Sequence, residues 1–142
     1  MKKLFPLAAL MFLFSCSDSP KEPEAPKPEN GLDAASKFIR AALDGEVNKA
    51  RTFIVNDSTN KQMLDIYEYK YTHTFTPEDK RAYKTASIRF EKDPRQLNDS
   101  TTIVYYSNSY KNKPDSLKVI RMNGQWFIDM NFMVQPKDSI PK

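Results

Sequence analysis

The sequence predicts an α+β domain in which N-terminal helices pack on a four-stranded antiparallel sheet. Up to residue 84, apolar side chains recur at three- and four-residue spacing, which is typical of amphipathic helices. From residue 88 onward the spacing changes to two, which is typical of strands. The dipeptide Asn123-Gly124 between two apolar runs is a strong hairpin signal and indicates antiparallel pairing.

Four helices are expected, at residues 33–43, 46–54, 59–72 and 77–84. Gly45 is a typical stop signal between the first two. Thr59 and Gln62 have capping-box spacing at the start of the third helix. Thr76 followed by Pro77 is a stronger start signal for the fourth, because proline suits the first helical position.

Four strands are expected, at residues 88–91, 101–106, 117–122 and 126–130. The hairpin at Asn123-Gly124 sets the register of the last two and places Trp126, Ile128 and Met130 on one face. We expect the core to contain Phe38, Leu43, Ala50, Phe53, Leu64, Tyr67, Ile88, Phe90, Ile103, Val119, Trp126 and Ile128.

The first sixteen residues are typical of a targeting signal rather than of part of the folded domain. Two lysines precede an apolar run of 11 residues, which is about half of the ~20 that a membrane-spanning helix needs. The run ends in Leu-Phe-Ser followed by Cys16, the only cysteine of the chain. This ending resembles the signal box of bacterial lipoproteins, which implies that Cys16 receives a diacylglycerol and, after cleavage, a further acyl chain such as palmitate. The alternative is an ordinary secretory signal in which Cys16 has no role.

Four regions follow from these patterns: a signal peptide at 1–15, the lipidated cysteine and a tether at 16–30, the α+β domain at 31–134, and a polar tail at 135–142. The tether contains four prolines and alternating charges, so we expect an extended chain that reaches at most ~45 Å. The predicted anchor is therefore lipid, and the predicted location is the cell envelope, at the outer membrane on either face.

Composition excludes several classes of function. The 142 residues are 28% charged and 39% hydrophobic, which is typical of one small globular domain. A single cysteine and a single histidine exclude a disulfide framework and most metal sites, so no cofactor or metal is expected. From residue 31 onward, 18 basic and 14 acidic residues are spread along the chain, which favours a solvated surface over a nucleic-acid site.

Residues 31–55, an alanine-rich helix followed by Gly-acid and a second helix, resemble one end of a known superfamily. Residues 117–130, an apolar strand, Asn-Gly and then Trp126, resemble its other end. The superfamily is that of nuclear transport factor 2-like domains, and the context resembles Bacteroidetes lipoproteins that carry such domains of unknown function. Glu46 stands where many relatives have aspartate. The resemblance implies a curved sheet wrapped around the helices as a cone, with a pocket between them.

Two classes of function are compatible with such a cone. The first is a non-catalytic binding or scaffolding module whose partner is an envelope protein or a small ligand. The alternative is a small isomerase- or dehydratase-type enzyme, as in the ketosteroid isomerases of the superfamily, with His73, Asp65 or Glu68 as base. Candidate pocket residues are Tyr67, Tyr71, His73 and Trp126. His73 also fits a solvated loop, and we expect Asp129 to face solvent or to pair with a lysine of a strand.

The dipeptide Asp-Ser occurs five times. Four copies continue with threonine or an aliphatic residue, which resembles the O-glycosylation signal of secreted Bacteroidetes proteins and makes candidates of Ser58, Ser100, Ser116 and Ser139. The competing interpretation is turn and cap chemistry, since aspartate and serine favour such positions and these lie at element boundaries.

Overall fold

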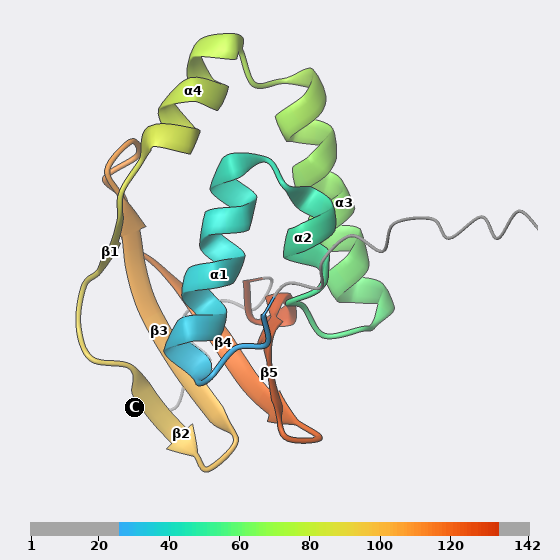
Figure 1. Cartoon of the computed structure of the whole chain (residues 1–142), viewed down its shortest axis with the longest axis vertical. Helices are drawn as coiled ribbons and strands as arrows, with labels where there is room; N and C mark the ends of the chain where they lie inside the picture. Colours follow the sequence, from blue (N-terminus) through green and yellow to red (C-terminus); the bar gives the residue numbers. More distant parts are fainter. Residues whose placement is uncertain (1–25, 134–142) are drawn as a thin grey trace, which may run out of the picture.

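Figure 1 shows the computed structural model, in which helices cover one face of an antiparallel sheet. The structure describes residues 26–133; the predicted leader and tail, Cys16 and Ser139 lie outside this range. The helices are α1 (Gly31–Asp44), α2 (Val47–Arg51), α3 (Ser58–His73), α4 (Pro77–Thr85) and the 3-10 helix η1 (Met130–Met133). The strands are β1 (Ile88–Phe90), β2 (Arg95–Asn98), β3 (Thr101–Asn108), β4 (Asp115–Met122) and β5 (Gln125–Asp129). The predicted α+β class is thus confirmed.

Three of the α-helices, α1, α3 and α4, begin at a residue whose short polar side chain accepts a backbone N–H of the first turn. Gly45 ends α1 with a φ of +75°, as expected of a stop signal. A capping box joins Thr76 and Asp79 at the start of α4, as its sequence indicates. The predicted cap of α3 is wrong by two residues, because the side chain of Asp57, rather than Thr59, accepts the backbone N–H of Asn60 at 2.7 Å.

The second helix is shorter than the predicted range of 46–54. After Arg51 the chain turns and Ile54 forms a parallel bridge to Ile128 of β5. The N–H of Ile128 donates to the carbonyl of Phe53 at 2.8 Å, and the N–H of Val55 donates to the carbonyl of Ile128 at 3.0 Å. The last residues of the predicted helix therefore satisfy the free edge of β5, a tertiary requirement that outweighs local periodicity.

The sheet has five strands rather than the four predicted, in the order β1-β3-β4-β5 with β2 also paired to β3. β1 and β2 lie one after the other along the same edge of β3, opposite residues 106–108 and 101–103. The residues between them include Pro94, which lacks the N–H that a continuous strand would need. This break and the polar sequence of β2 explain why the sequence predicts β1 but not β2.

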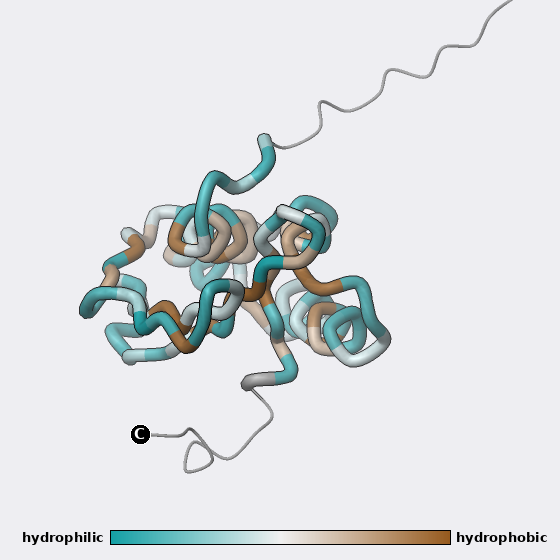
Figure 2. The backbone as a smooth tube through the Cα atoms, turned by 90° about the horizontal axis from the view of Figure 1, so that it is seen from below, coloured by the Kyte–Doolittle hydropathy of each residue, from teal (hydrophilic) through white to brown (hydrophobic). Residues whose placement is uncertain are grey.

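The core lies between the two layers, and in Figure 2 hydrophobic backbone segments run mainly through the interior. Buried as expected are Phe38, Leu43, Ala50, Phe53, Leu64, Ile103, Val119 and Ile128, whereas Tyr67, Ile88 and Trp126 are partly buried at its margin. Phe90 is 39% exposed, so its placement in the core is wrong. It ends β1, a short edge strand with only β3 beside it. Ile103 is buried but lies on the other face of β3 from the core residue Val104.

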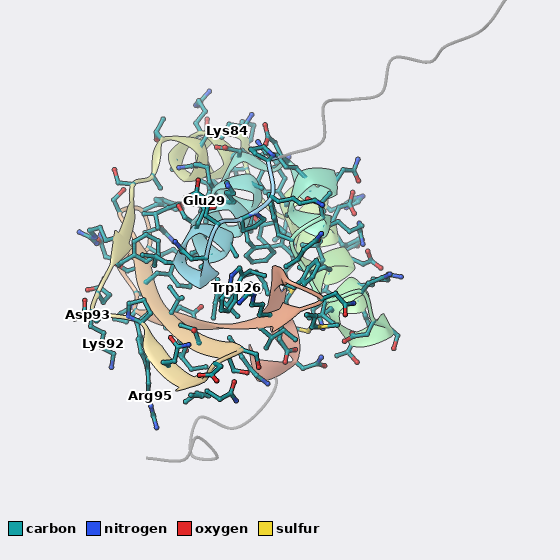
Figure 3. The ribbon with its side chains drawn as sticks, turned by 60° about the horizontal axis from the view of Figure 1, so that its bottom comes forward. Glu29, Lys84, Lys92, Asp93, Arg95 and Trp126 are labelled. Carbon is teal, nitrogen blue, oxygen red and sulfur yellow. The ribbon has the colours of Figure 1, made fainter. Side chains whose placement is uncertain are left out.

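The closing hairpin has the predicted turn and register. Asn123 and Gly124 have φ values of +50° and +77°, which Asn-Gly adopts at low cost. Trp126 pairs with Arg121 and Ile128 with Val119, so both side chains point toward the helices. Trp126 lies close to the first residue of α1, and Figure 3 shows it between α1 and the sheet.

A buried amide connects α3 to the end of the sheet. The side chain of Asn60 is fully buried, and its oxygen accepts the N–H of Met130 at 2.6 Å. Its nitrogen donates to the Asp57 carboxylate at 2.9 Å, and the side chain of Asn131 donates to Asp129 at 3.0 Å. Every polar group that this connection buries is thereby satisfied.

We expect Gly45→Ala to destabilise the domain more than Gly124→Ala. Both glycines have positive φ, so each alanine costs about 1 to 2 kcal/mol of backbone strain. At Gly45 the new Cβ would also overlap the Tyr71 ring, which adds about 1 to 3 kcal/mol, whereas Gly124 has open space around it. Thermal melts of the two glycine variants measure the difference in stability. When each is combined with Tyr71→Ala, this difference should disappear. Equal melting temperatures would contradict the packing of Tyr71 on Gly45.

We expect Asn60→Asp to make stability depend on pH in the opposite sense to ordinary acid unfolding. The substitution replaces an amide donor by a buried carboxylate beside Asp57, which costs about 3 to 5 kcal/mol when both are charged. Burial and the Asp57 charge raise the pKa of the new carboxyl, so the penalty is largest at neutral pH and falls as the group is protonated. Denaturant unfolding at neutral and mildly acidic pH measures this, with Asn60→Ala as the uncharged control. A deficit that grows on acidification would show that the amide is not buried beside Asp57.

Candidate functional site

The four candidate pocket residues do not lie together. Tyr67 and Tyr71 are neighbours on the inner side of α3, with ring centroids 6.1 Å apart. His73, the last residue of α3, is exposed and stacks on Tyr69 at 4.5 Å. Trp126 belongs to the closing hairpin beneath α1. A single pocket that uses all four residues is therefore not formed.

Tyr67 and Tyr71 instead begin a chain of aromatic rings, which we call the aromatic column. Tyr67 and Tyr71 contact Phe75, at 6.4 and 5.6 Å between ring centroids. Phe75 stacks on Tyr83 of α4 at 5.0 Å, and Tyr83 meets Tyr110 of the β3–β4 loop edge-on at 5.1 Å. Such pairs each contribute about 0.5 to 1.5 kcal/mol beyond the area that they bury. The column thus joins three separate elements and ends at the surface, where Tyr110 is 42% exposed.

The inner hydroxyls of the column are engaged with the end of α1. Tyr67 donates to the carbonyl of Ala42 at 2.5 Å, and Tyr71 donates to the carbonyl of Asp44 at 3.4 Å. The last carbonyls of a helix lack intrahelical partners, so these phenols serve as caps. Burial raises the pKa of Tyr67 far above its usual value, and it stays neutral and a donor. These two groups hold structure rather than move protons.

The carboxylates proposed as bases point away from the interior. Asp65 and Glu68 lie on the exposed side of α3, and Arg51 bridges them at 2.9 and 3.2 Å. Asp129 pairs with Lys118 at 3.0 Å, one of the two outcomes expected for it. A general base needs to reach a bound substrate, and none of these groups faces the space between the layers.

α4 and the β3–β4 loop, which meet where Tyr83 contacts Tyr110, carry four lysines, and we call them the lysine rim: Lys80 and Lys84 on α4, and Lys111 and Lys113 in the loop. The ammonium of Lys80 lies 5.3 Å from the Tyr71 ring centre, and that of Lys111 lies 5.5 Å from the Tyr83 ring centre. Both distances are within the range of a cation–π contact. α4 and the β3–β4 loop lie together at one end of the molecule in Figure 1, and Figure 3 labels Lys84 on the α4 side.

The acidic residues at this end already have partners. Glu78 pairs with Arg81 at 2.9 Å. Asp79 accepts the hydroxyl of Tyr110 at 2.6 Å as well as the backbone and hydroxyl of Thr76. These bonds, that from Tyr110 first, lower the pKa of Asp79 below its usual value. No carboxylate of the described residues forms an ion pair with the lysine rim, and the surface here is positive.

Three of the candidate glycosylation sites can be located. Ser58 is exposed at the start of α3, directly after the capping Asp57. Ser100 is exposed in the β2–β3 turn, where its hydroxyl bonds to Asn98 at 3.0 Å. Ser116 is half-buried in β4, and its N–H donates to the Asp115 carboxylate at 2.8 Å. Asp57 thus caps α3 and Asp115 bonds to the serine that follows it, whereas in the Ser100 turn the acceptor is Asn98. Ser58 and Ser100 are exposed.

Sequence reasoning missed the outer half of this site, namely Phe75, Tyr83, Tyr110 and the lysine rim. Phe75 and Tyr110 fall in connections, where aromatic residues carry no periodic signal. Their contact depends on α4 meeting the β3–β4 loop, which no local pattern indicates.

Two kinds of feature are absent from residues 26–133. In that range no cluster of three or more histidine, cysteine or acidic side chains could hold a metal ion. Nor does that range contain a helix long and apolar enough to cross a membrane. Comparison of the chain with family models, curated proteins and solved structures finds no match.

We expect the Tyr110–Asp79 bond to stabilise the domain only while Asp79 is ionised. Folding lowers this pKa, so the stabilisation is complete above the unfolded value of ~3.9 and is lost as pH falls through the folded value. Tyr110→Phe keeps the ring but removes the hydroxyl, so it should melt below wild type at neutral pH and approach it on acidification. Tyr69→Phe, at an exposed tyrosine of α3, is the control and should match wild type throughout. A pH-independent gap for Tyr110→Phe would contradict the bond.

Proposed function

We propose that this protein is a lipid-anchored lipoprotein of the cell envelope, at the outer membrane, whose domain is a non-catalytic binding or scaffolding module. The signal box before Cys16 and the proline-rich tether support the anchor. One observation favours binding over catalysis: Asp65, Glu68 and His73, the candidate bases, are exposed on α3. The hydroxyls of the interior residues Tyr67 and Tyr71 donate to carbonyls at the end of α1.

We also propose that the domain belongs to the nuclear transport factor 2-like cones. The order of elements supports this: a helix pair joined at Gly45, further helices, and an antiparallel sheet that ends in an Asn-Gly hairpin with Trp126. All four helices precede the sheet in the chain, and α1 contacts β3, β4 and β5, as a helix packed across the sheet would.

The surface best suited to binding is the outer end of the aromatic column with its lysine rim. It combines an exposed phenol ring, at Tyr110, with four lysines that form no ion pair among the described residues. Tyrosine is enriched at binding surfaces because its ring is apolar and its hydroxyl is polar, and Tyr110 is held here by contacts between α4 and the β3–β4 loop.

The anchor is tested by Cys16→Ala in the full chain. We expect wild type to fractionate with membranes and to incorporate labelled fatty acid, because two or more acyl chains hold a protein far more firmly than one. Cys16→Ala should lose the label and the processing that depends on it. Ser17→Ala, next to the cysteine, is the matched control and should keep both. An unlabelled wild type, or a Cys16→Ala protein that is labelled equally, would overturn the anchor.

A further inference from the structure

We propose that the outer end of the aromatic column binds an anionic phospholipid surface, with the lysine rim against the headgroups and Tyr110 at the interface. This proposal rests on the proposed anchor only in that the anchor brings the domain to a membrane. The partner of this surface would be the face of a lipid bilayer, which presents many phosphate groups, rather than a soluble protein.

Charge is the first argument. α4 and the β3–β4 loop, residues 77–85 and 108–114, carry five basic and two acidic residues. Glu78 pairs with Arg81, and Asp79 accepts hydrogen bonds from Tyr110 and Thr76. None of the four lysines of the rim forms an ion pair among the described residues, and only Lys111 lies close enough to Asp79 for its charge to act on that carboxylate. Each lysine near an anionic lipid surface strengthens binding about fivefold, so four of them form a substantial electrostatic patch.

The chemistry of the side chains is the second argument. Tyrosine is enriched at membrane interfaces because its ring is apolar and its hydroxyl is polar. Tyr110 is exposed, yet its ring is held against Tyr83 and its hydroxyl against Asp79, so little side-chain entropy remains to be lost on binding. The ammonium groups of Lys80 and Lys111 lie over the Tyr71 and Tyr83 rings, so cationic and aromatic groups are adjacent here. A surface that binds an acidic protein needs only positive charges. A surface that binds lipid also gains from a tyrosine held at the interface, as Tyr110 is here.

Reach is the third argument. The tether predicted from the sequence spans up to ~45 Å. A domain of about 100 residues has a radius of gyration of about 13 Å, so any of its faces can turn toward the membrane that carries the anchor. The tether is net acidic and is repelled by anionic lipid, whereas the domain is net basic. We therefore expect the contact to form through the domain and not along the tether.

The experiment uses the chain from Ser17 onward, which keeps all buried core residues, Ala34 to Met130, and omits the leader and Cys16. Without lipidation, any binding is independent of the anchor. Sedimentation with phosphatidylethanolamine vesicles that contain phosphatidylglycerol should pull the protein down, and vesicles without phosphatidylglycerol should not. Added salt should weaken the binding, because surface charges are screened.

The double variant Lys84→Glu/Lys113→Glu tests the location. Both lysines are exposed, so the fold should be unaffected, which a thermal melt verifies. Loss of two lysines should weaken vesicle binding at least about 25-fold, the product of two fivefold effects. The control Lys49→Glu/Lys61→Glu makes the same change of net charge on α2 and α3 and should bind nearly as wild type.

Three results would overturn the proposal. Equal binding to vesicles with and without phosphatidylglycerol would show that lipid charge is not recognised. Equal loss in both double variants would show an effect of net charge without a defined surface. Binding to soluble polygalacturonate but not to the vesicles would assign the surface to an acidic polysaccharide. None of these results bears on acylation at Cys16, so the two proposals fail separately.

Discussion

β5 is shared between the sheet and the helix layer, and the rest of the fold depends on how its free edge is satisfied. One edge pairs with β4, and the other bonds through Ile128 to the chain between α2 and α3. Directly after β5, the N–H of Met130 enters a buried bond with Asn60 of α3. Because a buried N–H or amide without a partner costs about 1 to 3 kcal/mol, these bonds leave α3 a single position relative to the sheet.

The position of α3 in turn decides what lies inside the domain. With its first turn held at the end of β5, α3 directs Tyr67 and Tyr71 toward α1 and directs Asp65 and Glu68 to solvent. Tyr71 can approach the α1–α2 turn so closely only because Gly45 has no side chain. The orientation of α3 about its own axis therefore places Tyr67 and Tyr71 in the inner half of the aromatic column. The same orientation keeps the carboxylates of Asp65 and Glu68 out of the interior.

α4 is attached to the same C-terminal end of α1, through Arg40. The guanidinium of Arg40 donates to the Ala86 carbonyl at 2.8 Å and to the Lys84 and Tyr83 carbonyls, all at the end of α4. Asp44 holds Arg40 from the opposite side at 2.8 Å. The side chain of Arg40 thus bonds three carbonyls at the C-terminal end of α4, the helix in which Tyr83 stacks on Phe75. The positions of Tyr83, Tyr110 and the lysine rim depend on this attachment of α4 to α1. No residue of α1 belongs to the aromatic column or to the lysine rim.

The sequence by itself determined the class of the fold, the four helices, and the closing hairpin with its register. Each depends on local patterns: the caps at Thr76 and Gly45, the change of period near residue 88, and the positive φ values that Asn123 and Gly124 accept. The anchor at Cys16 stays a prediction, and it too comes from a local pattern, because a signal box is a run of consecutive residues.

Only the tertiary structure decided where α2 ends, that β1 and β2 divide one edge of β3, and which side chains meet. Phe53 and Ile54 were predicted to be helical, but this part of the chain pairs with β5 instead. Phe90 was predicted to be in the core, but the edge position of β1 leaves it exposed. Tyr67 and Tyr71 were recognisable as candidates, but Tyr83, Tyr110 and the lysine rim were not. Their proximity arises from contacts between elements far apart in the chain, and periodicity carries no information about such contacts.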